Sequence, residues 1–335
     1  MSHQSDVYWL SVAFEQSLIP YSVKRNPRVG AVIVDKSGLV VAKGFHDGYG
    51  SAHAEQVALD VAKSKAKGAT LYVSLAPCNH VGKTPSCCVE IINKGIKRVV
   101  YSQNDANPIS VGNIEFLKAN GIEVSNIKSP KQFENVNNRW FKSYEYVRPF
   151  VTVKIAMTID GKIGATKDRT TKLSGKESQL EVHQIRNGCD AIVTGTGTVL
   201  VDNPKLNVRY PSKVKATHQP LRCVVGDRQI KAEALINDNS AQTIFLRRMN
   251  PRLVLEQLSN LEVRTVLVEA GPRLVTQFLK QDLVDELIIY MAPTAIGQGQ
   301  AFIEEVLHPI SVRAIKISSV GLVGRDLRFK VSLRN

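Results

Sequence analysis

Apolar and polar positions alternate along the whole chain in a way that predicts short strands and helices. Apolar residues at three- and four-residue spacing predict helices, and short apolar runs between turn residues predict strands. In the first part of the chain the predicted helices are 6–19, 53–67, 87–93 and 113–120, and the predicted strands are 31–34, 39–43, 69–75, 98–102 and 122–124. Such alternation with short connections is typical of an α/β layer, with helices packed on a sheet.

Residues 126–149 interrupt this pattern, because they lose apolar periodicity and gain asparagine, lysine and tyrosine. We therefore predict two domains, residues 1–146 and 147–335, as a length of 335 residues also favours. The second domain is again predicted to be α/β. Its predicted strands are 150–157, 191–194, 221–225, 243–246, 265–268 and 286–291, and its predicted helices are 175–187, 250–258 and 272–280.

The composition is that of an ordinary globular protein, with 43% hydrophobic and 22% charged residues. No apolar run approaches the roughly 20 residues that span a bilayer, and residues 1–6 lack the profile of a signal peptide. We therefore expect a cytoplasmic protein with no membrane partner. Three of the five cysteines lie within residues 78–88, which suits metal ligation in a reducing compartment better than disulfides.

A formal net charge of +14 admits a polyanionic partner such as a nucleic acid. The basic residues are nevertheless dispersed, and the densest groups, Lys63–Lys67 and Arg247–Arg248, lack the interleaved aromatic residues that stack on bases. We therefore expect no nucleic-acid partner. A small phosphorylated substrate would also be served by a positive field.

The candidate chemistry lies in His53, Glu55, Cys78 and Cys87. One imidazole and two thiolates fill three corners of a zinc tetrahedron and leave the fourth for water. A carboxylate two residues from the imidazole can carry the proton of that water to a departing amine. The pattern predicts a zinc-dependent hydrolytic deaminase, with His53, Cys78 and Cys87 as metal ligands and Glu55 as the catalytic residue.

Spacing leaves some of these assignments open. Cys88 could replace Cys87, and a purely structural zinc would take Cys88 or His80 as a fourth ligand. Deaminases of nucleic-acid bases close their signature with Cys-x-x-Cys, whereas here eight residues separate Cys78 from Cys87. This longer loop carries His80 and Lys83, which are donors suited to a phosphorylated substrate.

Motifs in both halves of the chain carry a specific resemblance. In the first half they are Asn26-Pro27-x-Val29-Gly30, His53-Ala54-Glu55 and Pro77-Cys78-x-His80-x-Gly82-Lys83-Thr84-Pro85-x-Cys87. In the second half they are Asp160-Gly161-Lys162, Gly195-x-Gly197-Thr198-Val199-x-x-Asp202-Asn203-Pro204-x-Leu206 and Val268-Glu269-Ala270-Gly271-Pro272. With these motifs the chain resembles the bifunctional deaminase/reductase family of riboflavin biosynthesis over nearly its whole length.

This resemblance implies two successive reactions and two cofactors, Zn²⁺ and NADPH. A cytidine-deaminase-like three-layer domain would deaminate 2,5-diamino-6-ribosylamino-4(3H)-pyrimidinone 5′-phosphate by zinc-dependent hydrolysis. A dihydrofolate-reductase-like domain would then use NADPH to reduce the ribosyl group to ribityl. The implied partner is thus a small phosphoribosyl-pyrimidine, and we expect a homo-oligomer.

The resemblance also implies residue roles in both domains. The deaminase substrate contacts it implies are Asn26, His46, His80, Lys83, Asp105 and Asn107. The implied NADPH contacts are Ala156, Thr198, Asp202, Gly271, Pro272, Arg273 and Leu274, and the implied reductase substrate contacts are Lys154, Thr170, Arg186, Leu206, Arg209 and Glu269. Independently of the resemblance, a strand that runs through a glycine turn into a helix with proline at its start favours phosphate binding at Gly271.

The chain departs from the family pattern at several positions. Ala76 stands where glutamate precedes Pro-Cys, Lys172 where tryptophan is expected near the cofactor, Ala106 where the family has proline, and Gly226 where aspartate is expected. These departures keep open a deaminase with a weakened or altered reductase. Two further interpretations also stay open, a nucleic-acid base deaminase and a non-catalytic zinc-stabilised binding protein, and Glu55 speaks against the latter.

Overall fold

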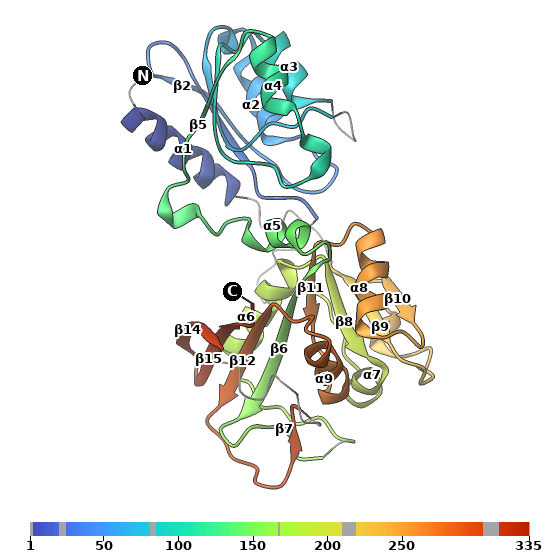
Figure 1. Ribbon diagram of the computed structural model, residues 1–335. Coiled ribbons are helices and arrows are strands. Elements are labelled where there is room, and N and C mark those ends of the chain that lie inside the picture. The colour runs from blue at the N-terminus through green and yellow to red at the C-terminus, as the bar shows by residue number, and fades with distance from the viewer. Residues whose placement is uncertain are drawn as a thin grey trace. The chain divides into compact units, whose positions relative to one another are not determined.

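The computed structural model describes residues 3–19, 25–80, 85–166, 168–209, 219–303 and 315–334. The chain divides into two compact units, Met1–Glu145 and Tyr146–Asn335 (Figure 1). Lys83, one of the predicted substrate contacts, lies outside the described residues. Within the described ranges, no helix has the length and apolar character needed to cross a membrane.

The first unit is built on a mixed sheet with strand order β2-β1-β3-β4-β5 in the described residues. Strand β1 pairs antiparallel with β2 and β3, whereas β3, β4 and β5 run parallel. The bounds are β1 (Gly30–Val34), β2 (Val40–Phe45), β3 (Thr70–Leu75), β4 (Arg98–Gln103) and β5 (Glu123–Asn126). The strands predicted for this half are therefore confirmed.

Helices cover both faces of this sheet (Figure 1). Leu10 and Ala13 of α1 form one core with Val32 and Tyr72, whereas α2, α3 and α4 pack against the other face around Leu59, Ile91 and Leu117. The helices described here are α1 (His3–Ser17), α2 (Ala54–Ala62), α3 (Cys87–Asn93), α4 (Asn113–Ala119) and α5 (Asn138–Glu145). The predicted three-layer α/β arrangement is confirmed.

Two glycines allow helices to lie directly on the sheet. A Cβ atom at Gly30 would lie 2.0 Å from the carbonyl oxygen of Ala13 in α1, and one at Gly44 would lie 2.2 Å from the carbonyl oxygen of Ala54 in α2. Any side chain at Gly44 would therefore push α2 away from β2. This contact matters for function because α2 begins directly after His53 and contains Glu55.

The second unit contains an eight-stranded sheet with order β10-β9-β8-β11-β6-β12-β15-β14 in its described part. The strands from β10 to β12 run parallel, and β15 and β14 are antiparallel additions at one edge. The strands of this sheet are β6 (Phe150–Thr158), β8 (Ala191–Gly195), β9 (Leu221–Val225), β10 (Thr243–Leu246), β11 (Thr265–Val268), β12 (Glu286–Ala292), β14 (Lys316–Val323) and β15 (Asp326–Ser332). A short pair, β7 (Lys162–Gly164) and β13 (Gln300–Ala301), stands apart from it.

Helices also cover both faces of the second sheet. Helices α8 (Pro251–Asn260) and α9 (Pro272–Lys280) pack on one face, whereas α6 (Lys176–Asn187) and α7 (Thr196–Asp202) pack on the other. All strands and helices predicted for this half are found. The sequence patterns did not predict α7 or the β14–β15 hairpin.

Helix α5 lies in a stretch for which no helix was predicted. Residues 126–149 lose apolar periodicity, yet residues 138–145 form α5. The helix is short and polar, so few apolar positions mark it. It buries Trp140 and Ser143, and Trp140 also lines the pocket of the first unit.

Candidate active sites

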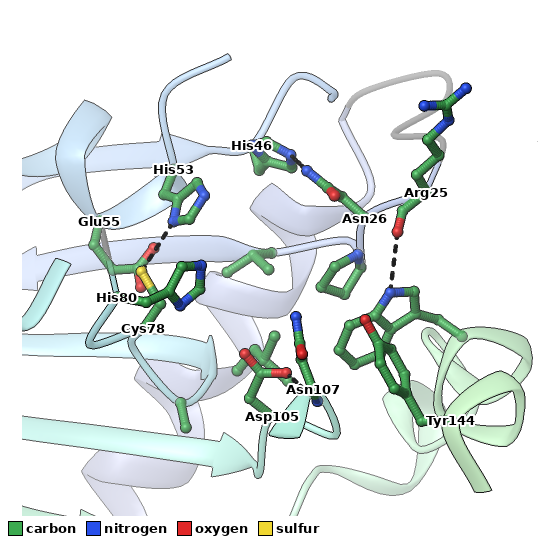
Figure 2. Close-up of a pocket in the computed structure, with 15 residues that line it drawn as sticks. Arg25, Asn26, His46, His53, Glu55, Cys78, His80, Asp105, Asn107 and Tyr144 are labelled. Atoms are coloured by element: carbon green, nitrogen blue, oxygen red, sulfur yellow. Dashed lines mark hydrogen bonds between the residues drawn. The ribbon is translucent and has the colours of Figure 1, made fainter. Parts of the chain in front are cut away.

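Three predicted metal ligands meet in the first unit. His53 Nδ1 lies 3.4 Å from Cys78 Sγ (Figure 2). It also lies 3.2 Å from Cys87 Sγ. The three donor atoms lie within 4.8 Å of one another. His53 comes from the start of α2, Cys78 follows β3, and Cys87 opens α3, so each ligand stands at the end of a regular element.

This donor set fits zinc. Tetrahedral angles and Zn–N and Zn–S bonds of about 2.1 and 2.3 Å place nitrogen and sulfur about 3.6 Å apart, close to the distances found here. A hydrogen bond from Cys87, helped by the charge of His53, outweighs burial and lowers the pKa of Cys78 to about 4. Cys78 is therefore held as a thiolate, the form that binds metals.

The local backbone holds the ligand segments together. The side chain of Gln56 accepts a hydrogen bond from the backbone N–H of His53 and donates one to the carbonyl of Pro85. The backbone N–H of Cys88 donates to the carbonyl of Cys78 over 3.0 Å. These bonds join the start of α2 to both cysteine-bearing segments.

Cys88 and His80, the two residues that spacing left open as ligands, lie elsewhere. The Cys88 thiol faces the carbonyl oxygens of Pro77 and Asn113 at 3.6 and 3.7 Å, and burial raises its pKa to about 12. In the described part of the chain, neither Cys88 nor His80 belongs to a group of metal-ligating atoms. The arrangement therefore leaves a coordination position that these residues do not fill.

Glu55 lies beside the metal-ligand cluster and is only 3% exposed. Burial raises the pKa of its carboxyl group to about 7, and the nearby positive charge of His53 only partly opposes this effect. A carboxyl group with a pKa near neutrality can both take up and release a proton at physiological pH.

Asn26 and His46 line the same pocket and contact each other. The amide nitrogen of Asn26 lies 2.7 Å from His46 Nε2, and His46 Nδ1 lies 3.1 Å from the carbonyl of Ala52. Burial lowers the pKa of His46, so its ring is neutral. These partners assign the proton to Nδ1, which donates to Ala52, while Nε2 accepts from Asn26.

Asp105, Asn107 and His80 form another side of the pocket. Asp105 accepts hydrogen bonds from the backbone N–H of Asn107 over 2.8 Å and from the Ser110 hydroxyl over 2.6 Å. Nδ1 of His80 is buried without a hydrogen-bond partner in the described residues. A buried polar atom of this kind is a ready contact for a polar ligand.

The pocket also contains residues that the sequence patterns did not single out. Arg25, Trp140 and Tyr144 line it, and two of them come from α5 (Figure 2). The available signal was the three- and four-residue spacing of Asn137, Trp140 and Tyr144, which places them on one helix face. Because α5 has only 8 residues, this spacing occurs over about two turns, which is too few for a clear helical pattern in the sequence.

In the second unit, three predicted substrate contacts form a buried charge cluster. Arg186 donates two hydrogen bonds to Glu269, over 2.5 and 3.0 Å, and Lys154 Nζ lies 3.6 Å from the same carboxylate. Burial alone would raise the pKa of Glu269, but Arg186 and Lys154 outweigh it and lower the pKa to about 2. The cluster is formed by the middle of β6, the residue that follows β11, and α6.

The loop at residues 206–209 carries two further predicted contacts, Leu206 and Arg209, and hydrogen bonds hold it near this cluster. The backbone N–H of Arg209 donates to His183 Nδ1 over 3.2 Å, and its guanidinium group donates to the side chain of Asn207. Arg186 donates to the carbonyl of Asn207 over 3.3 Å, which links the loop to the Glu269 cluster. Leu206 is buried, so its side chain belongs to the core and only its backbone is available to a ligand.

Two hydrogen bonds involve the predicted NADPH contacts. The backbone N–H of Gly271 donates to the Thr198 hydroxyl over 3.0 Å, and the hydroxyl of Thr170, a predicted substrate contact, donates to Asp202 over 2.5 Å. Gly271 precedes α9, which has Pro272 at its first position, and a helix start of this kind favours phosphate. The turn therefore fits a dinucleotide. Arg273 is exposed there, Leu274 and Ala156 are half-buried, and Pro272 is buried.

Comparison with known proteins identifies the family. Residues 149–323 match the RibD C-terminal domain, and residues 3–103 match the cytidine and deoxycytidylate deaminase zinc-binding region. The riboflavin biosynthesis protein RibD of Aquifex aeolicus is 34% identical over 321 residues, which cover 88% of this chain and 90% of that protein. The chain belongs to the RibD family.

Other members support this identification over the full length. RibD of Corynebacterium ammoniagenes is 39% identical over 286 residues, covering 85% of this chain and 84% of that protein. The structure of Acinetobacter baumannii RibD, form 1, has a TM-score of 0.91 at 30% identity and covers 99% of both chains. A deaminase/reductase from Thermotoga maritima has a TM-score of 0.83 at 30% identity and covers 98% of this chain and 99% of that one.

Membership in the RibD family establishes the coarse function. The chain is a bifunctional enzyme of riboflavin biosynthesis, with a zinc-dependent deaminase activity and an NADPH-dependent reductase activity. A small molecule is its substrate, and neither a nucleic-acid deaminase nor a deaminase with a weakened reductase is favoured.

The two neighbouring cysteines give a direct test of the ligand set. Cys87→Ala should weaken zinc binding by more than about 100-fold, because changes outside the ligand shell already cost 10–100-fold. Cys88→Ala is the matched control and should retain one zinc per chain, since its thiol faces two carbonyl groups instead. Metal analysis after dialysis against a chelator measures both, and zinc loss in the control alone would contradict the assignment.

The Glu269 cluster predicts a pH dependence of stability. Its folded pKa of about 2 is below the ordinary value of 4.5, so its stabilising contribution is complete above pH 4.5 and is lost as pH falls through 2. The difference in unfolding free energy between wild type and Glu269→Gln should therefore shrink by about 2 kcal/mol between pH 7 and pH 3.

Urea unfolding followed by circular dichroism measures this difference. The two tryptophans, Trp9 and Trp140, both belong to the first unit, so their fluorescence reports that unit's transition separately. A difference that stays constant down to pH 3 would show that Glu269 is not held ionised by its neighbours.

Proposed function

We propose that the first unit deaminates 2,5-diamino-6-ribosylamino-4(3H)-pyrimidinone 5′-phosphate and that the second reduces the ribosyl group of the product to ribityl. The observation that carries this proposal is the pocket that joins His53, Cys78 and Glu55 to predicted contacts for a polar pyrimidine. The Thermotoga maritima relative, a diaminohydroxyphosphoribosylaminopyrimidine deaminase/5-amino-6-(5-phosphoribosylamino)uracil reductase, supports the same substrates.

His53, Cys78 and Cys87 would hold zinc in the deaminase unit. When bound, zinc acts as a Lewis acid that makes water nucleophilic at neutral pH. Glu55 takes a proton from the attacking water and delivers it to the amine, which leaves as ammonia. Its place at the start of α2, two residues after His53, keeps the carboxyl group beside the ligand cluster throughout.

The remaining pocket residues bind and orient the pyrimidine. Asn26 and His46 form a fixed pair on one side, and Asp105, Asn107 and His80 offer donors and acceptors on the other. The unpartnered Nδ1 of His80 supports a direct contact with substrate. Lys83 remains a predicted contact for the phosphate.

In the reductase unit, Lys154, Arg186 and Arg209 supply positive charge for the phosphoribosyl group. Glu269 orients Arg186 by accepting two hydrogen bonds from it and Lys154 by an ion pair, and Thr170 and the backbone of Leu206 complete the substrate contacts. NADPH supplies the hydride when it is bound. The NADPH contacts are Ala156, Thr198, Asp202 and the turn Gly271–Leu274.

The departure at Gly226 has a local structural reason. Gly226 has φ of +126°, and a Cβ atom there would lie 2.5 Å from the Thr196 hydroxyl oxygen. Aspartate would therefore require a different backbone at this turn. Lys172 is exposed, whereas Ala76 is buried in the deaminase pocket wall, and nothing in the structure explains either replacement. A homo-oligomer also remains our expectation.

Replacing Glu55 tests the proton-transfer role. Glu55→Gln should lower the deamination rate by at least about 10²–10⁴-fold, because the amide cannot carry the proton. Zinc content and reduction of the separately supplied deaminated intermediate should both be unchanged. The matched control is Glu115→Gln, an exposed position on α4, which should retain full activity. Undiminished turnover by Glu55→Gln would refute the role.

A further inference from the structure

Helix α5 forms one wall of the deaminase pocket. Asn137 directly precedes the helix, and Trp140 and Tyr144 follow it at three- and four-residue spacing, so the three side chains lie on one side. Trp140 and Tyr144 line the pocket, and Asn137 and Trp140 are only 4% and 7% exposed. This face lies in the stretch of chain that lacked apolar periodicity.

Hydrogen bonds fix this face to the segment that carries Asn26. The side chain of Asn137 accepts from the backbone N–H of Arg28 over 2.8 Å and donates to the carbonyl of the same residue over 3.0 Å. The indole N–H of Trp140 donates to the carbonyl of Arg25 over 3.2 Å (Figure 2). The helix face therefore cannot shift without moving Asn26, so it belongs to the pocket as a rigid part.

Tyr144 presents its polar tip to the pocket. Its ring packs edge-on against Trp140, with 4.9 Å between the ring centroids, which limits its rotation. Figure 2 shows the phenol pointing into the pocket at the end away from His53 and Cys78. A hydroxyl group held in this way can donate a hydrogen bond without losing much side-chain entropy on binding.

The chemistry of the substrate indicates which group reaches that end. The name of the Thermotoga maritima reductase substrate, 5-amino-6-(5-phosphoribosylamino)uracil, keeps the amine at position 5 and the ribosylamino group at position 6. The amine that leaves is therefore at position 2, and its carbon must lie at the metal-ligand end. Position 6 is separated from position 2 by one ring nitrogen, so its ribosylamino group leaves the ring in a direction away from the metal ligands, and its length allows it to reach the pocket wall formed by α5.

We propose that Tyr144 determines specificity for the ribosyl phosphate by hydrogen bonding to that group. Trp140 and Asn137 are positioning residues that hold Tyr144 and the Asn26 segment together. This inference rests on the proposed deaminase function. Tyr144, on α5, would be a substrate contact in addition to those that the sequence motifs indicated.

The test separates binding from chemistry. For the ribotide, Tyr144→Phe should raise KM about tenfold and leave kcat within about twofold, because a bond made equally in the ground and transition states changes KM alone. Tyr8→Phe, at an exposed position on α1, is the matched control and should match wild type. Zinc content and the kinetics of the reductase should be the same in all three proteins.

Each result decides between the claims. If wild type does not deaminate the ribotide, the proposed function fails whatever Tyr144 does. If wild type is active but Tyr144→Phe keeps the wild-type KM, or loses kcat at constant KM, the Tyr144 proposal is overturned.

A second measurement does not depend on the folding of the Tyr144 variant. In a Trp9→Phe background Trp140 is the sole tryptophan, and ribose 5-phosphate should change its fluorescence saturably, in competition with the ribotide. No change at saturating ribose 5-phosphate would also overturn the proposal.

Discussion

The deaminase site depends on the close approach of helix α2 to strand β2. At Gly44 the helix backbone is so near that even a methyl group would overlap the carbonyl oxygen of Ala54. Strand β2 pairs with β1, β1 pairs with β3, and the chain leaves β3 toward Cys78. The distance between His53 and Cys78 is therefore set by one helix-on-sheet contact and two strand pairings. The geometry of the metal site is therefore fixed by residues that do not themselves bind the metal, such as Gly44.

The same arrangement separates the roles of neighbouring groups. His53 and Glu55 share the start of one helix, yet His53 faces the thiols whereas Glu55 is buried beside them, with its pKa raised by that burial. In the reductase unit the opposite electrostatics apply. Glu269 is also buried, but Arg186 and Lys154 hold it ionised. Burial gives a proton carrier in one case and a fixed anion in the other, and the difference lies in the neighbouring charges.

Much of this could be predicted from the sequence, and the exceptions have physical causes. Helices α3 and α9 lie at their predicted bounds, because capping residues and apolar spacing agree there. The metal-ligand cluster was predictable because its chemistry demands particular residue types at particular spacings.

Helix α5 was missed because its buried residues are one tryptophan and one serine, and its Tyr144 faces the pocket. The β14–β15 hairpin was missed because β14 is largely exposed and its apolar residues resemble a surface segment. The Glu269 cluster joins residues from three elements, and no local pattern reports such a meeting.

The central claim is that one chain carries out both reactions in sequence. Purified protein should be given the diamino-pyrimidinone ribotide, first alone and then with NADPH, while product masses and NADPH absorbance are recorded. We expect replacement of one amine by oxygen without NADPH, and then consumption of one NADPH for each deaminated molecule, with reduction of the ribosyl group. Deamination without subsequent NADPH oxidation would contradict the account of the second unit. Unchanged ribotide would contradict the account of the first.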